Sequence, residues 1–283
     1  MPPSRRGPAV MSDSPEIDSS RVLAGLYSAS AREYAELSAP VLQPTSERLI
    51  AAMPLAGATT VLDLGAGTGA LFPALRAAAP KARVIAVDRA TGMLREARAR
   101  GVRAPLAAME LAQLGIRESV ADAALLAFVL FLIPDPAAAL AEVRRVLRPG
   151  GVVGCTSWGQ GYELPGTAIW TLELDLLGAG TDSKPDAAKR DTLMDTTEKL
   201  GSLLEDAGLT VSRVWMERPE RRWTWPQLLE LSSRYGATSR RLATLDPASR
   251  KECLARVGAA LAALSAEELV YRPEMLLAVA NRT

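Results

Sequence analysis

The stretch Thr59-Thr60-Val61-Leu62-Asp63-Leu64-Gly65-Ala66-Gly67-Thr68-Gly69-Ala70-Leu71 carries an apolar run directly into a loop of alternating glycines. The apolar run predicts a short buried strand, and the apolar residues that recur through 71–78 at helical spacing predict a helix. Glycines between the two allow a sharp turn and leave bare main chain at the helix N-terminus, where free N–H groups can bind a ligand. A glycine-rich turn can also be purely structural, so the neighbouring motifs must decide.

Two kinds of nucleotide-like cofactor fit this loop. The run 65–70 has the dinucleotide pattern G-x-G-x-x-A, and Asp88 ends a second apolar strand (84–87) where an acid that binds ribose is expected. Asp63, however, lies two residues before the first glycine, where its carboxylate would repel a pyrophosphate. S-adenosylmethionine has no phosphate and carries a positive ammonium and a positive sulfonium, so it fits Asp63 better.

Four motifs in order resemble one family. They are Asp63-Leu64-Gly65-Ala66-Gly67-Thr68-Gly69, Val87-Asp88, Glu110-Leu111 and Leu147-Arg148-Pro149-Gly150-Gly151. In this order they resemble the class I S-adenosylmethionine-dependent methyltransferases, and within them the small-molecule branch of the ubiquinone/menaquinone-biosynthesis type. The resemblance implies an α/β fold, a Rossmann-like seven-stranded sheet of order 3-2-1-4-5-7-6 with the last strand antiparallel, covered by a helical lid.

The same resemblance implies a cofactor site. Asp88 would hold both ribose hydroxyls, and Glu110 would accept a hydrogen bond from the adenine amino group, although the family usually has an aspartate there. Met93 would lie against adenine, but a methionine at helical spacing is an equally good core residue. The cofactor-binding residues implied are Asp63, Gly65, Ala66, Gly67, Gly69, Asp88, Arg89, Met93, Glu110, Leu111 and Phe128.

The substrate side is expected to be apolar and aromatic. The segment after Phe131 lacks the Asn/Asp–Pro–Pro–aromatic signature of relatives that modify DNA bases or glutamine amides, which favours an apolar substrate pocket. By resemblance, Tyr27 and Tyr34 occupy the paired aromatic positions of an N-terminal cap; packing of the lid explains both equally well. The substrate-binding residues predicted are Tyr27, Tyr34, Phe131, Trp158 and Trp170. The candidates for a proton acceptor are Tyr27, Tyr34, Glu163 or a water molecule.

Length and composition agree with one domain. A chain of 283 residues that is 48% hydrophobic can bury one full α/β core. We expect a disordered tail over 1–20 and a methyltransferase domain over 21–283, with a helical cap at 21–53 and a helical lid insertion at 223–265. The apolar stretch 122–133 is too short to span a membrane and predicts the central fourth strand. The final strand is predicted over 270–280, and the sequence leaves open whether Met1 or Met11 is the natural start.

Charge and rare residues limit the partners. The net charge of +1 gives no electrostatic reason to expect nucleic acid or a membrane surface. The two cysteines, Cys155 and Cys253, lie far apart in sequence and indicate a reduced, cytoplasmic chain. No histidine is present, so histidine metal ligands and a histidine base are excluded and no metal site is expected. The oligomeric state stays open.

These observations predict an S-adenosylmethionine-dependent enzyme that methylates an O or N atom of an apolar small molecule in specialised metabolism. The protein would act mainly by proximity and desolvation. Methylation of carbon is the nearest alternative. A protein that binds the cofactor without methyl transfer, such as a pericyclase or a scaffold, shares every motif. An NAD-dependent oxidoreductase explains Gly65 to Gly69 and Asp88, but not Asp63 or Glu110.

Overall fold

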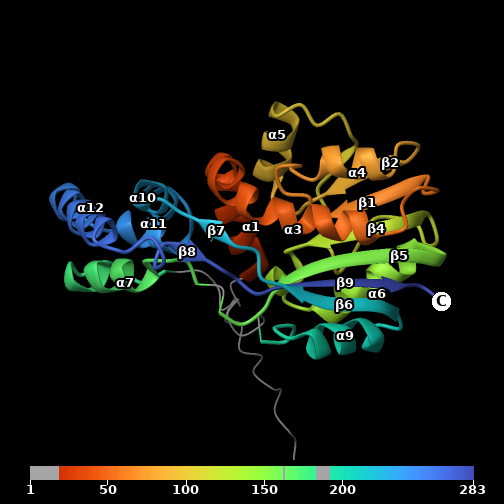
Figure 1. The fold of residues 1–283 in the computed structure, drawn as a ribbon. Helices are drawn as coiled ribbons and strands as arrows, with labels where there is room; N and C mark the ends of the chain where they lie inside the picture. The colour runs from red at the N-terminus through yellow and green to blue at the C-terminus, as the bar shows by residue number, and fades with distance from the viewer. Residues whose placement is uncertain (1–18, 162, 183–191) are drawn as a thin grey trace, which may run out of the picture.

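The computed structural model describes residues 19–161, 163–182 and 192–283. Residues 1–18 of the tail that was predicted to be disordered lie outside the described residues. A seven-stranded sheet in the order β3-β2-β1-β4-β5-β9-β6 lies between helices on both of its faces (Figure 1). Strand β9 pairs antiparallel with both β5 and β6, so the predicted order and the antiparallel last strand are confirmed.

The strands of this sheet are β1 (Thr60–Leu64), β2 (Arg83–Val87), β3 (Leu106–Ala107), β4 (Ala121–Ala127), β5 (Leu147–Trp158), β6 (Thr210–Glu217) and β9 (Met275–Asn281). The helices that flank it are α3 (Ala39–Ala52), α4 (Phe72–Ala78), α5 (Thr91–Ala99), α6 (Pro136–Val146) and α9 (Thr197–Asp206). Within the described residues, no helix is both long enough and apolar enough to cross a bilayer.

Alternating strand residues bury the two faces of the sheet. On β4, Ala123 and Leu125 pack with α3 and α4, whereas Ala124 and Leu126 pack with α6 and α9. This period of two is what a strand buried on both faces requires. Cys155 is part of the α6/α9 layer, where burial raises the pKa of its thiol to about 12. It is a core residue.

Two strands differ from the prediction. The fourth strand was predicted over 122–133, but β4 ends at Ala127 because Phe128 adopts a left-handed backbone with φ of 52°. A 3₁₀ turn, η2 (Leu130–Leu132), follows. The final strand was predicted over 270–280, but Pro273, which has no N–H to donate, separates two strands. Val270–Tyr271 forms β8, which pairs with β7 (Arg221–Arg222) outside the main sheet.

A helical cluster with its own core lies to one side of the sheet (Figure 1). Its members are α7 (Thr167–Leu176), α10 (Trp225–Arg234), α11 (Gly236–Leu242) and α12 (Pro247–Ala262). They bury Trp170, Leu228 and Cys253 among other apolar side chains. Helices α10 and α12 begin with Pro226 and Pro247 in the first turn, as the sequence predicts.

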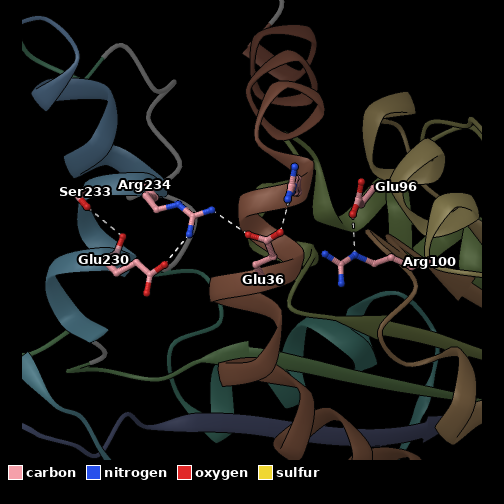
Figure 2. A network of polar contacts seen from close by, with 7 residues as sticks. Glu36, Glu96, Arg100, Glu230, Ser233 and Arg234 are labelled. Carbon is pink, nitrogen blue, oxygen red and sulfur yellow. Dashed lines mark hydrogen bonds and ion pairs between the residues drawn. The ribbon is translucent and has the colours of Figure 1, made fainter. Parts of the chain in front are cut away.

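The N-terminal helices lie between the sheet and this cluster (Figure 1). They are α1 (Ser19–Ala29), α2 (Ala31–Glu33) and one π-helical turn, η1 (Tyr34–Ser38). Helix α1 approaches α5 closely at Gly92, where a Cβ would lie 2.3 Å from the carbonyl oxygen of Ser28. On the other side, Glu36 of η1 accepts hydrogen bonds from Arg32 and from Arg234 of α10, at 2.8 and 2.9 Å (Figure 2). The N-terminal helices therefore contact both parts of the molecule.

Candidate cofactor and substrate cavity

A cavity of about 710 Å³ opens at the carboxyl ends of β1, β2 and β4, where open α/β sheets bind ligands. Its floor is formed by the loops that follow these strands, which contain Gly65, Asp88 and Phe128. Its roof is formed by α1, η1 and the start of α11. The volume lies in the upper part of the range of about 300–1,000 Å³ that is usual for ligand pockets, so a cofactor and a small acceptor can share it.

Three glycines of the loop that follows β1 adopt a left-handed backbone conformation, which sets the shape of this glycine loop. Gly65, Gly67 and Gly69 have φ values of 79°, 54° and 75°. A Cβ on Gly65 would lie 2.8 Å from Cβ of Val129, closer than real atoms approach. A Cβ on Gly67 would lie 3.6 Å from Cε1 of Tyr34, so main chain and aromatic ring face each other directly. The loop thus presents bare backbone to the cavity.

The carboxylate of Asp88 is fixed by main-chain groups. Its Oδ2 accepts a hydrogen bond from the N–H of Gly67 and its Oδ1 from the N–H of Ala90, both at 2.8 Å. Burial raises the pKa of Asp88, and these two hydrogen bonds act against that rise. Each carboxylate oxygen keeps a lone pair, so the group can still accept hydrogen bonds from a diol in the cavity.

Asp63 is a buried acid at the end of β1, with 3% of its surface exposed. Burial, and secondarily the nearby charge of Asp88, raise the pKa of Asp63 to about 7. No side-chain hydrogen bond or ion pair joins it to any residue in the described ranges. Asp63 lies behind the glycine loop and does not itself line the cavity. Among the described residues no ion pair joins Asp63 or Asp88 to a cation, so these two neighbouring acids favour a positively charged ligand over a pyrophosphate.

Apolar walls enclose the floor. Met93, Leu111 and Phe128 line the cavity and are at least 90% buried. The ring of Phe128 lies 5.0 Å from that of Trp158 between centroids, at 50°. At the rim, Nε of Arg89 forms an ion pair with Oε1 of Glu110 at 2.5 Å. These residues surround the cavity with surfaces suited to a flat heteroaromatic ring.

Three tyrosines form the roof. The rings of Tyr27 and Tyr34 meet edge to face at 6.1 Å, and those of Tyr34 and Tyr235 at 5.8 Å. Burial raises the pKa of Tyr34, and the charges of Tyr27, Asp88 and Asp63 raise it further. Burial also raises the pKa of Tyr235, which is hydrogen-bonded to Tyr27. Tyr34 and Tyr235 therefore stay protonated at neutral pH and are poor proton acceptors.

The structure brings most of the predicted site residues to this cavity, but not all of them. Tyr27, Tyr34, Gly65, Gly67, Asp88, Arg89, Met93, Glu110, Leu111, Phe128, Phe131 and Trp158 line it. Ala66 does not line it, and Gly69 packs against Val102 instead. Trp170 is buried in the helical cluster, and Glu163 is exposed away from the cavity. Over the described residues, no group of three or more acidic or thiol side chains is arranged to hold a metal ion.

The sequence interpretation missed the contribution of α11. Tyr235, Gly236, Ala237 and Arg240 line the cavity, although they belong to the segment that the sequence identified only as a lid. The one signal in the sequence is Tyr235-Gly236 between two amphipathic helices. That pattern marks a turn, but it does not indicate which surface the turn faces.

Comparisons with known proteins find similarity mainly in the part of the chain that runs from β1 to β5. Residues 62–155 match the family described as "Methyltransferase domain". An uncharacterized 37.1 kDa protein in transposon TN4556 of Streptomyces fradiae is 35% identical over 161 residues, which are 55% of this chain and 44% of that protein. A malonyl-[acyl-carrier protein] O-methyltransferase of Xylella fastidiosa is 33% identical over 139 residues, 47% of each chain. The chain thus spans about half the length of these curated relatives.

A solved structure shows the same fold over nearly the whole chain. It is a complex of the Haloferax volcanii Trm112 methyltransferase activator with a putative methyltransferase. The superposition gives a TM-score of 0.56 at 17% identity and covers 92% of this chain and 97% of the other. At this identity the likeness establishes the fold and no more.

Proposed function

We propose that the chain is a class I S-adenosylmethionine-dependent methyltransferase that transfers a methyl group to an O or N atom of an apolar small molecule. The observation that carries this proposal is the cavity in which Asp88 and the glycine loop face an apolar wall that includes Phe131. The same enclosure holds a place for the cofactor and a place for the acceptor. The relative named as an O-methyltransferase favours oxygen as the accepting atom.

We assign the cofactor to the floor of the cavity. Asp88 would accept hydrogen bonds from the ribose hydroxyls, because its two oxygens are already held in place by Gly67 and Ala90. Asp63 and Asp88 would favour the positive charge of the ligand, and Met93 and Leu111 would flank adenine. When bound, S-adenosylmethionine supplies a methyl group that is already electrophilic.

The protein residues then have to position the acceptor and exclude water. Tyr27, Tyr34 and Tyr235 cover the cavity from the roof, and Trp158 with Phe131 provides an apolar side. Holding two reactants in line and removing solvent accounts for several kcal/mol of a barrier in well-oriented systems. Tyr34 is protonated and Glu163 does not line the cavity, so an acceptor that reacts without a strong protein base fits the site best.

Calorimetric titration with S-adenosylhomocysteine and, separately, with NAD tests the assignment. The product analogue avoids turnover. We expect wild-type protein to bind S-adenosylhomocysteine and not NAD, and Asp88→Ala to weaken that binding at least tenfold, or about 1.4 kcal/mol. Glu118→Ala, which removes an exposed acid outside the cavity, is the matched control and should bind as wild type does. Binding of NAD alone would show that the glycine loop holds a dinucleotide.

Product analysis separates the remaining alternatives. Labelled methyl recovered on oxygen or nitrogen of an acceptor agrees with the proposal, and label on carbon identifies a C-methyltransferase. A protein that binds the cofactor but converts its substrate without consuming it would be a pericyclase, and one that converts nothing would be a scaffold. Asp88, Gly67 and Met93 would serve the cofactor equally in each case, so these residues do not distinguish the alternatives.

A further inference from the structure

One fixed cation lines the roof of the cavity. The side chain of Arg240, on α11, donates from Nε to Oδ1 of Asp182 and from Nη2 to Oδ2, both at 2.7 Å. Only 29% of the side chain is exposed. A bidentate pair of this kind holds the planar guanidinium in a single orientation. Arg240 is therefore a rigid group of the cavity and not a mobile surface arginine.

The pair with Asp182 leaves one edge of the guanidinium available. Nη1 of Arg240 makes no hydrogen bond to the residues that the structure describes. Tyr27 and Tyr235 line the same cavity as Arg240. The N–H groups of Nη1 on this fixed arginine are donors from which an anionic oxygen can accept hydrogen bonds.

Arg241, the next residue, does not share the position of Arg240 in the cavity wall. Arg241 directs its Nη2 to Asp175 and its Nε to the carbonyl of Gly180, and it does not line the cavity. Arg89, the other arginine of the cavity wall, is paired with Glu110 on the cofactor side. Arg240 is thus the cation that faces the acceptor side.

The chemistry of the surroundings narrows the ligand. The cavity wall outside the cofactor floor includes Leu42, Phe131 and Ile133, so the body of the ligand has to be apolar. Asp182 offsets the charge of Arg240, which disfavours a doubly charged phosphate more than a singly charged group. A carboxylate is planar, singly charged and already ionised at neutral pH, so it can bind Arg240 without first giving a proton to a protein base.

We propose that Arg240, oriented by Asp182, binds a carboxylate of the acceptor, which is an amphipathic carboxylic acid. This inference rests on the proposed function, because it assumes that the floor of the same cavity holds the cofactor. Arg240 is a binding and specificity-determining residue in this account. The carboxylate lies at the roof and the apolar body of the acid lies against the side walls.

Titration of the protein loaded with S-adenosylhomocysteine tests the subsite. The probes are phenylalkanoates from phenylacetate to 6-phenylhexanoate, each with its primary amide, which has the same shape without the charge. We expect at least one acid to bind at least tenfold more tightly than its amide. Arg240→Gln should abolish the difference between acid and amide, whereas the matched variant Arg241→Gln should keep it.

Each outcome has a distinct meaning. If no acid binds more tightly than its amide, or if Arg241→Gln loses the preference as completely as Arg240→Gln, the carboxylate subsite is overturned. Tighter binding of phenyl phosphate than of every acid overturns it as well. Unchanged affinity of Arg240→Gln for S-adenosylhomocysteine shows that the variant is folded and that the cofactor site is intact. If wild-type protein fails to bind S-adenosylhomocysteine, the proposed function fails instead.

Discussion

The floor and the roof of the cavity fix their functional groups in different ways. On the floor, main-chain atoms fix the functional groups. The N–H groups of Gly67 and Ala90 hold Asp88, and glycines in left-handed backbone shape the loop. On the roof, side chains hold one another, as in the pair of Arg240 with Asp182 and the edge-to-face rings of Tyr34 and Tyr235. The main-chain contacts of the floor join two neighbouring strand-end loops, with Gly67 21 residues from Asp88. The side-chain contacts of the roof join more distant segments, with Arg240 58 residues from Asp182.

The largest effect is expected from breaking the floor with Gly65→Ala. The substitution places a Cβ in left-handed backbone and 2.8 Å from Cβ of Val129, which cannot swing away as the end of a flexible chain can. Left-handed strain of about 1–2 kcal/mol and overpacking of about 1–3 kcal/mol should together lower the free energy of unfolding by roughly 2–5 kcal/mol. Urea denaturation of the ligand-free protein measures this loss.

Gly150→Ala is the control for backbone strain alone. Gly150 has the same φ of 79°, but a Cβ there would meet nothing within 4 Å. This variant should lose only the strain, about 1–2 kcal/mol, and should bind S-adenosylhomocysteine as wild type does. Equal losses for the two variants would show that the contact of Gly65 with Val129 has no energetic importance.

The contrast between floor and roof also explains what the sequence could predict. Asp63, Gly65 and Asp88 follow from short motifs at strand ends, since topology alone brings the carboxyl ends of parallel strands together. The order of the sheet came from the resemblance to a family and is confirmed. The predicted end of β4 was wrong, because nothing in the sequence indicates that the backbone of Phe128 is left-handed.

The roof could not be predicted because its geometry is set by contacts between distant segments. Tyr235 and Arg240 face the cavity only because α11 lies over it, and Trp170 is turned into the core of the helical cluster. An arginine followed by another arginine gives no indication of which one points inward. Here Arg240 lines the cavity and Arg241 does not. Composition and periodicity identify a helix, but its partner surface depends on the whole fold.

A second test of the floor concerns the pH dependence caused by Asp63. Its pKa is raised from 3.8 to about 7, so between these values the folded protein binds more protons at this site than the unfolded chain. Stability therefore falls as pH rises from about 4 to 7. At about 1.4 kcal/mol per pKa unit, the loss is on the order of 4 kcal/mol. Asp63→Asn should remove this part of the slope in urea titrations of the ligand-free protein.

Asp122 provides a control of opposite sign. Burial acts to raise its pKa, but hydrogen bonds from Thr59, Thr60 and Arg148 overcome this and lower the pKa to about 2. The stability that Asp122 contributes is therefore present above pH 4 and lost as pH falls towards 2. Asp122→Asn should alter the acid limb and leave the slope between pH 4 and 7 unchanged. If Asp63→Asn also leaves the slope of stability between pH 4 and 7 unchanged, the pKa of Asp63 is not raised by folding and the prediction is wrong.

The smallest effect, and the sharpest test of the roof, is expected from Glu36→Gln. Glu36 accepts hydrogen bonds from Arg32 and Arg234 and so joins η1 to α10 across the roof (Figure 2). Because these groups are exposed, the free energy of unfolding should hardly change. Local opening is more sensitive: amide hydrogen exchange over 225–242 should become faster, while exchange in β1 and β4 stays as in wild type. Glu252→Gln breaks an equally exposed pair, with Arg256, that lies within α12 alone. It should leave exchange over 225–242 unchanged, and acceleration there in both variants would mean that the roof is not held by the contact between η1 and α10.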